Sequence, residues 1–225
     1  MGIAENLNSI NNSLPDSVKL IAVSKFNPAE KVIEAIKAGQ TVFGENRIQE
    51  AAPKFDLIRS QGYEAELHII GSLQRNKVKE AVRIATMIQS ADRLELIEEI
   101  EKQCSKINKK IQILFEMHTG EESKSGFTSS EEVFNILKMF EQGAFPHIEP
   151  KGFMTMAPFT DDVELVRNSF RQLKHIKNKA NQLFPSLSLT ELSMGMSGDY
   201  KTAIEEGSTM VRIGTAIFGA RDYSK

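Results

Sequence analysis

Cysteine is nearly absent from this sequence, and its histidines follow no metal-binding pattern. The one cysteine among 225 residues, Cys104, cannot form an internal disulfide, and it lies on an apolar stripe of helical spacing with Leu94, Ile97 and Ile100. We therefore interpret Cys104 as a small core residue and not as a nucleophile. The spacing of the four histidines matches no motif such as H-E-x-x-H, so we expect no metal site.

The chain also has no excess of charge of one sign and no long hydrophobic run. Lys and Arg number 28 against 30 Asp and Glu, and the two signs are mixed along the chain. Nucleic acids and anionic membranes need a concentrated basic face, so we expect neither as a partner. No apolar run approaches the ~18 residues of a membrane span, and the N-terminus does not have the plan of a signal peptide. We expect a cytoplasmic protein.

No stretch rich in proline, glycine or serine marks a linker. At 225 residues the chain has the length of one domain with a sizeable core. We therefore expect a single domain over residues 1–225.

Eight short apolar segments alternate with segments of helical periodicity, after an opening helix over residues 3–12. The predicted strands are 19–25, 41–43, 67–70, 86–89, 111–116, 150–156, 187–192 and 209–213. Eight strands alternating with helices favour a closed α/β barrel, the (β/α)8 or TIM barrel, with an open doubly wound sheet as the alternative.

The last two strands each run into a loop of small residues and then into a helix start. The two segments are Leu192–Asp199 and Met210–Gly219. Backbone N–H groups at such turns point toward one place, which is one way to hold a phosphate. The loops after strands seven and eight are where (β/α)8 barrels form phosphate sites. A phosphate site alone does not identify the ligand.

One lysine stands at the corresponding end of the first strand. Lys25 follows four consecutive apolar residues, 20–23, and Ser24, and it precedes a helix start. We expect Asn27 to be the N-cap of that helix and Pro28 its first residue. Lys25 therefore lies on the rim where barrel enzymes carry their functional residues.

The sequence resembles the pyridoxal phosphate homeostasis proteins from residue 18 to residue 219. The segments that carry the resemblance are Ala22-Val-Ser-Lys25, Phe43-Gly-Glu-Asn46, His68-Ile-Ile-Gly-Ser-Leu-Gln74 with Asn76-Lys77, Gly152-Phe-Met154, Leu192-Ser-Met-Gly-Met-Ser197 with Asp199, and Gly207-Ser-Thr-Met-Val-Arg-Ile-Gly-Thr-Ala-Ile-Phe-Gly219. This family has the barrel fold of the N-terminal domain of alanine racemase, here with an extra N-terminal helix. Its members bind pyridoxal 5'-phosphate (PLP) as a Schiff base and are regarded as carriers or regulators of that cofactor.

The resemblance implies roles for particular residues. Lys25 would form the Schiff base, since partial desolvation makes the neutral amine of a lysine accessible. Ser197, Gly214 and Thr215 would hold the phosphate through hydroxyl and backbone N–H groups. The remaining expected site residues are Arg212 facing the pyridine nitrogen, Asn46 and Met194 lining the ring pocket, and His68, Ser72 and Met154 as weaker wall candidates.

An arginine at the ring nitrogen has a chemical consequence. It does not give up its proton in a protein, so it keeps the pyridine nitrogen unprotonated and weakens the ring as an electron sink. Transamination and decarboxylation are therefore disfavoured.

The resemblance to racemases is incomplete. Racemisation needs a second acid or base across the substrate, and none of Tyr63, Tyr200 and Tyr223 is an obvious one, although Tyr200 follows the phosphate loop and stays open. Phe26-Asn-Pro28 replaces the tyrosine-containing turn that follows the lysine in alanine racemases. Leu67 stands where many family members carry tryptophan, which puts in doubt a role of that position in ligand selection.

Two function classes therefore remain. The first is a PLP-binding protein that delivers the cofactor to PLP-dependent apoenzymes, and we favour it because the rim shows one base and no substrate-carboxylate clamp. The second is a slow PLP-dependent amino-acid racemase. We expect a monomer or a weak homodimer.

Overall fold

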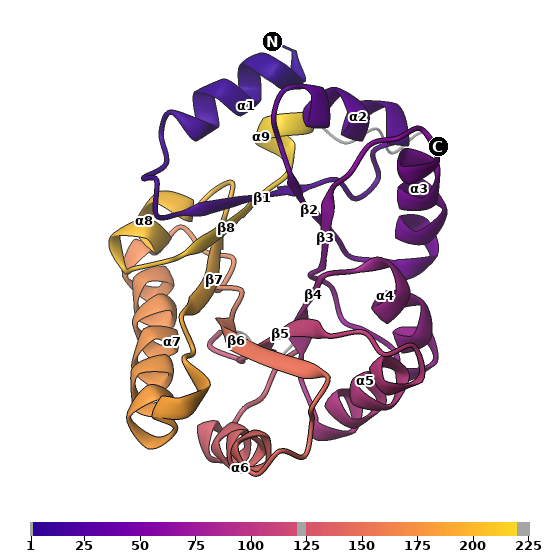
Figure 1. The fold of residues 1–225 in the computed structure, drawn as a ribbon. Helices are drawn as coiled ribbons and strands as arrows, with labels where there is room; N and C mark the ends of the chain where they lie inside the picture. The colour runs from indigo at the N-terminus through magenta and orange to yellow at the C-terminus, as the bar shows by residue number, and fades with distance from the viewer. Residues whose placement is uncertain (1, 121–124, 220–225) are drawn as a thin grey trace.

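The computed structural model describes residues 2–120 and 125–219, and within them eight parallel strands close into a barrel in sequence order (Figure 1). The strands are β1 Lys19–Val23, β2 Val42–Glu45, β3 Glu66–Ile69, β4 Met87–Ala91, β5 Ile111–Glu116, β6 Ile148–Met154, β7 Glu191–Met196 and β8 Met210–Ile213. The closed barrel confirms the predicted fold class, and an open sheet is excluded.

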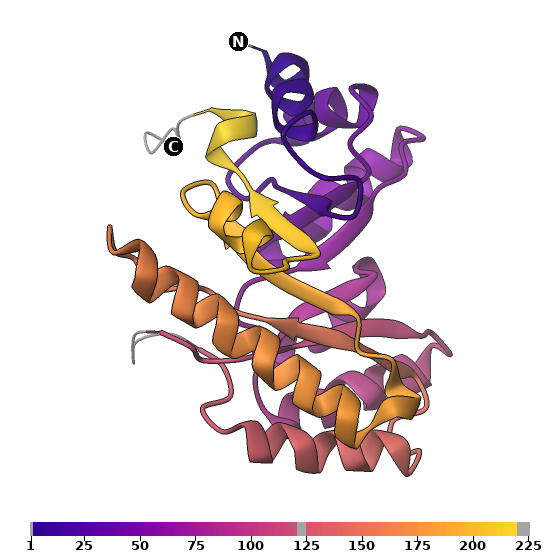
Figure 2. The ribbon, with the colours of Figure 1, turned by 90° about the vertical axis from the view of Figure 1, so that its left-hand side faces the viewer.

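Helices alternate with the strands and surround the barrel. They are α1 Ile3–Asn11, α2 Ala29–Lys37, α3 Ile48–Ser60, α4 Val78–Ile84, α5 Leu94–Lys106, α6 Ser130–Glu141, α7 Val163–Leu183, α8 Tyr200–Glu205 and α9 Thr215–Phe218. In Figure 2 the long helix α7 lies across the outside of the barrel, where it packs on β6 and β7. No helix in the described part of the chain is long and apolar enough to cross a membrane.

The strands are apolar on both faces because both faces are covered. Six side chains fill the lower barrel interior, namely those of Ile21, Val42, Met87, Leu114, Met154 and Met210. Alternate residues pack outward against the helices. Phe43 of β2, for example, meets Phe55 of α3 edge-to-face with ring centroids 6.3 Å apart. Cys104 is wholly buried in this outer layer, which confirms it as a core residue, and burial raises the pKa of its thiol to about 11.

The extra N-terminal helix supports the segment that follows β8. α1 buries Ile3, Leu7 and Ile10, and it lies beside α9 (Figure 1). The side-chain amide of Asn6 donates a hydrogen bond to the carbonyl of Ile217 at 2.9 Å. α1 therefore helps to fix the turn that contains Thr215.

The strand boundaries were predicted well except at strand seven. We expected it over residues 187–192, but it spans Glu191–Met196. Residues Pro185–Leu187 instead form a 3₁₀ turn, and Ser188 adopts a left-handed backbone conformation with φ 50° that no strand continues through. The shift of four residues moves the strand's end from Leu192 to Met196.

Candidate functional site

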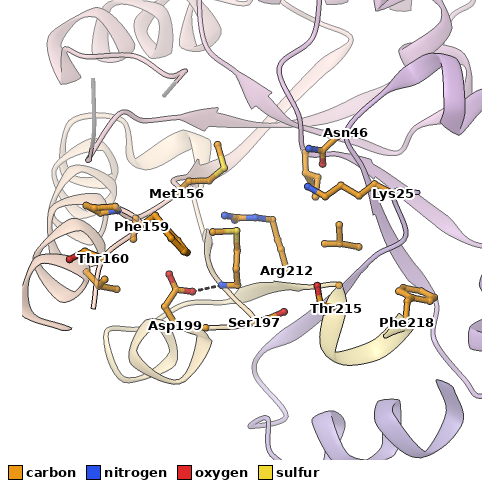
Figure 3. Close-up of a pocket in the computed structure, with 18 of the residues that line it drawn as sticks. Lys25, Asn46, Met156, Phe159, Thr160, Ser197, Asp199, Arg212, Thr215 and Phe218 are labelled. Atoms are coloured by element: carbon orange, nitrogen blue, oxygen red, sulfur yellow. Dashed lines mark hydrogen bonds between the residues drawn. The ribbon is translucent and has the colours of Figure 1, made fainter. Parts of the chain in front are cut away.

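A pocket of about 460 Å³ opens at the carboxyl ends of the strands, within the range of about 300–1,000 Å³ that small-molecule sites occupy. Its walls come from the ends of β1, β7 and β8 and from the segments that follow β1, β2, β3, β6, β7 and β8. Figure 3 shows Lys25 and Asn46 on one side, Met156 and Phe159 on the opposite side, and Arg212 between them. The structure thus brings together the chain's first strand and its last two, as the sequence predicted.

A tight turn after β1 positions Lys25. The N–H of Asn27 donates to the carbonyl of Ser24 at 3.0 Å, and Phe26 takes a left-handed conformation with φ 64°. The Asn27 side chain donates to the carbonyl of Lys25 at 3.2 Å, so it stabilises the turn and does not cap the helix. Our N-cap prediction was wrong by one residue, because α2 begins at Ala29 with Pro28 as its N-cap.

A buried ion pair lies behind this turn. The carboxylate of Glu45, wholly buried, accepts hydrogen bonds from Ser24 Oγ and from Lys54 Nζ, each at 2.7 Å. Lys54 Nζ also donates to the carbonyl of Ser24 at 3.0 Å. Burial raises the pKa of Glu45, and the charge of Lys54 opposes that shift. The pair therefore fixes both the side chain and the carbonyl of the residue before Lys25.

Two small-residue turns form the lower wall in Figure 3. After β7, the N–H of Met196 donates to Asp199 Oδ1 at 2.5 Å, and the N–H of Asp199 donates to the Met196 carbonyl at 3.1 Å. Between them, Ser197 and Gly198 are exposed in the pocket. A Cβ added to Gly195, which has φ +95°, would lie 2.6 Å from Ala203 Cβ, so glycine there lets α8 pack closely on the strand.

The second turn follows β8. Gly214 and Thr215 line the pocket where α9 begins. A Cβ on Gly214 would come within 3.1 Å of the Val23 carbonyl. The missing side chain therefore lets the end of β8 approach the end of β1, and it brings Thr215 near Lys25.

The buried guanidinium of Arg212 lines the middle of the pocket (Figure 3). Arg212 is 4% exposed. One terminal nitrogen donates to Ser193 Oγ at 2.7 Å, and the other donates to the carbonyl of Thr155 at 2.8 Å. Burial lowers the pKa of Arg212 to about 10, while the charges of Asp199 and Glu116 act in the opposite direction. The group therefore remains a cation at neutral pH.

Met194 does not lie where we predicted it. Its side chain is wholly buried in the layer between barrel and helices. Side chains alternate along a strand, and Ser193 points inward to Arg212, so Met194 must point outward. Met196, two residues further on and 37% exposed, lines the pocket instead. A register shift between Ser193 and Met196 in the pairing of β7 with β8 interrupts the alternation, and Met196 therefore faces the pocket although it lies two positions after Met194.

The weaker wall candidates also lie away from the pocket lining. His68 and Met154 are buried inside the barrel below the pocket, and Ser72 is exposed elsewhere on the rim. Leu67 packs in the outer core. No pattern in the sequence indicated the wall that the segment after β6 provides, which contains Met156, Phe159, Thr160 and Asp161.

No histidine, tyrosine or cysteine is among the residues that line the pocket in the described ranges. Tyr63 lies between α3 and β3, as predicted, and the Tyr200 hydroxyl lies 3.4 Å from Ser13 Oγ. Tyr223 lies outside the described residues. The same ranges contain no group of three or more His, Cys, Asp or Glu that could hold a metal ion.

The sequence is similar to known proteins over its whole length. Residues 2–222 match the family model described as alanine racemase, N-terminal domain. The pyridoxal phosphate homeostasis protein of Haemophilus influenzae is 37% identical over 235 residues, covering 100% of this chain and 98% of that protein. The protein of that name from Vibrio alginolyticus is 40% identical, covering 93% of this chain and 89% of the relative.

Solved structures agree. PipY of Synechococcus elongatus, with PLP bound, superposes with a TM-score of 0.90 at 34% identity, covering 96% of this chain and 100% of that one. Alanine racemase of Clostridium difficile gives 0.78 at 16% identity, and this chain covers 57% of it, which shows the fold alone. Fold and pocket thus define a barrel of the alanine racemase N-terminal type. The chain belongs to the pyridoxal phosphate homeostasis protein family.

The buried ion pair behind Lys25 yields a stability prediction. Glu45→Gln leaves the Lys54 ammonium buried without a counter-ion, and we expect it to lower the free energy of unfolding by about 3–5 kcal/mol. Adding Lys54→Met should recover part of that loss, because the uncompensated charge is then gone. Urea denaturation of the two single variants and the double variant measures both effects.

Glu50→Gln is the matched control. Glu50 pairs with Arg47 on the surface of α3 at 3.2 Å, and loss of such an exposed pair should cost less than about 1 kcal/mol. Equal losses of unfolding free energy for Glu45→Gln and Glu50→Gln would show that the pair behind Lys25 contributes no more to stability than an exposed ion pair.

Proposed function

We propose that this protein binds PLP and takes part in intracellular PLP homeostasis as a carrier or regulator of the cofactor. The observation that carries the proposal is one pocket in which a lysine, two small-residue turns with hydroxyl groups and a buried arginine face the same space. PLP carries an aldehyde, a phosphate and a ring nitrogen, and each has a counterpart there. Relatives that share the family's name, and PipY with PLP bound, support the proposal.

Lys25 holds the aldehyde. Its Nζ attacks the aldehyde carbon, a carbon–nitrogen double bond forms, and the aldehyde oxygen leaves as water. The reverse reaction, or attack by another amine, releases the cofactor. The turn after β1 and the Glu45–Lys54 pair behind it orient this lysine.

Ser197, Gly214 and Thr215 hold the phosphate through hydroxyl and N–H groups, which suit an anion. Arg212 faces the ring nitrogen as a donor that keeps its own proton at neutral pH, so that nitrogen stays unprotonated. PLP supplies electron withdrawal when its ring nitrogen is protonated, and this pocket suppresses that property. Asn46 and Met196 line the ring space.

The pocket favours storage and delivery over catalysis. Its lining, within the described residues, offers no histidine, tyrosine or cysteine as a second acid or base beside Lys25. Phe159 at its mouth is 96% exposed, so no described residue packs over this side chain. The recipients we propose are PLP-dependent apoenzymes.

The first prediction concerns Lys25. After incubation with PLP and reduction with borohydride, peptide mass spectrometry should place the adduct on the peptide that contains Ser24 and Lys25. Lys25→Ala should abolish it without unfolding the protein, because this half-buried side chain contributes little packing. Lys19→Ala, at the opposite end of the same strand, is the matched control and should keep the adduct. An adduct on any other lysine would contradict the assignment.

The second prediction separates the phosphate from the rest of the cofactor. Ser197→Ala removes one charge-assisted hydrogen bond, worth about 1.5–3 kcal/mol. Affinity for PLP should fall roughly tenfold to a hundredfold, while affinity for pyridoxal, which lacks the phosphate, should barely change. Equal losses for both ligands in an equilibrium titration would show that Ser197 does not contact the phosphate.

The third prediction tests delivery against catalysis. PLP-loaded protein mixed with a PLP-free transaminase should restore that enzyme's activity. Incubation with either enantiomer of alanine in deuterated water should leave the α-proton unexchanged above a control without protein. Exchange that depends on Lys25 would favour the racemase alternative.

A further inference from the structure

A hydrogen-bonded network of buried polar side chains extends from Arg212 into the barrel interior, away from the pocket. Ser193 Oγ, the acceptor for Arg212, lies 2.7 Å from Gln89 Oε1. Gln89 Nε2 lies 2.9 Å from His68 Nδ1, and His68 Nε2 faces Glu66 Oε2 at 3.8 Å. Ser193, Gln89 and His68 are each at most 1% exposed, whereas the Glu66 side chain is 54% exposed at the other end of the barrel.

The orientation of the Gln89 amide, with Oε1 toward Ser193 and Nε2 toward His68, sets the direction of every hydrogen bond in this network. Arginine only donates, so Ser193 accepts from Arg212 and donates its own hydrogen to Gln89 Oε1. Gln89 then presents its NH₂ group to His68. His68 Nδ1 must therefore be the acceptor, and the proton of the neutral ring lies on Nε2, toward the carboxylate of Glu66.

The surroundings support this single arrangement. The second hydrogen of Gln89 Nε2 points to Met210 Sδ at 3.8 Å, so both amide hydrogens have acceptors. Burial lowers the pKa of His68, which keeps the ring neutral. A rotated Gln89 amide would place its oxygen beside His68 Nδ1, which would then have to carry the ring proton, and the lone pair of His68 Nε2 would face the Glu66 carboxylate. Buried polar networks are stable only when every member is satisfied, so rotation is costly.

The network of buried polar groups sets the orientation of the Arg212 guanidinium. The carbonyl of Thr155 holds one of its terminal nitrogens, and Ser193 holds the other. One contact would leave a planar guanidinium free to pivot, whereas two set its plane. Ser193 is a directed acceptor only while Gln89 takes its hydrogen.

We propose that Gln89 is a positioning residue, which acts through Ser193 to hold the Arg212 guanidinium in the plane that meets the ring nitrogen of the bound cofactor. This inference rests on the proposed function, because it assigns Arg212 to that nitrogen. Gln89 itself does not touch the ligand.

Gln89→Leu tests the proposal with an apolar side chain of similar size. The readout is the preference for PLP over the analogue in which a C–H group replaces the ring nitrogen. A well-placed hydrogen bond from a charged donor corresponds to roughly tenfold preference or more in the unchanged protein. We expect the preference to fall below about threefold in Gln89→Leu by the same conversion. An unchanged preference would overturn the proposal.

Gln40→Leu is the matched control. Gln40 is also a buried glutamine, and its Nε2 donates to the carbonyls of Leu20 at 3.0 Å and Val42 at 2.6 Å, away from Arg212. It should lower stability and leave the ligand preference unchanged. If Gln89→Leu does not fold, Ser193→Ala replaces it, with Ser193→Thr expected to restore the preference because it keeps the hydroxyl.

The direction of the hydrogen bonds in this network is tested separately in protein without PLP. Nitrogen-15 NMR of the His68 ring should show an unprotonated Nδ1 and a protonated Nε2 at neutral pH. A proton on Nδ1 would overturn the proposal whatever the ligand does. If the protein does not bind PLP at all, the proposed function fails, and the His68 spectrum still decides the direction of these hydrogen bonds.

Discussion

The buried guanidinium of Arg212 is the constraint on which the site depends. A charge inside an apolar barrel is costly unless hydrogen bonds satisfy it, and here Ser193 and Thr155 do so from strand β7 and from the residue after β6. Below Arg212 the barrel is closed by Gln89 and His68 and by apolar side chains. Above it lies the pocket. The Arg212 guanidinium thus lies between the buried core of the barrel and the pocket.

A buried ion pair, Glu45 with Lys54, constrains the wall of the pocket that carries Lys25. Glu45 and Lys54 hold the backbone just before Lys25, so the reactive amine starts from a fixed strand end and not from a free loop. Glu45 lies on strand β2 and Lys54 on helix α3, so the pair joins the barrel to the helix layer around it. The segment after β6, in which Phe159 is exposed, adds a further wall.

Much of this was predictable from sequence because it depends on local pattern. Continuous apolar runs gave the eight strands, and small residues after the last two gave the turns that contain Ser197 and Gly214. Strand seven was misplaced because Leu187 and Leu189 made residues 187–192 look like a strand, whereas the left-handed Ser188 delays β7 to Glu191. The network of buried polar groups below Arg212 was missed for another reason. Gln89 and Ser193 are 104 positions apart, and only closure of the barrel brings them within 2.7 Å.

We propose that Arg212 donates to an unprotonated ring nitrogen and thereby keeps the bound cofactor unreactive. The most direct measurement is the nitrogen-15 chemical shift of PLP labelled at its ring nitrogen and bound to the protein at neutral pH. We predict the shift of a hydrogen-bonded, unprotonated pyridine, which should move toward the value for free pyridine in Arg212→Met. The shift of a protonated pyridinium in the unchanged protein would contradict the account.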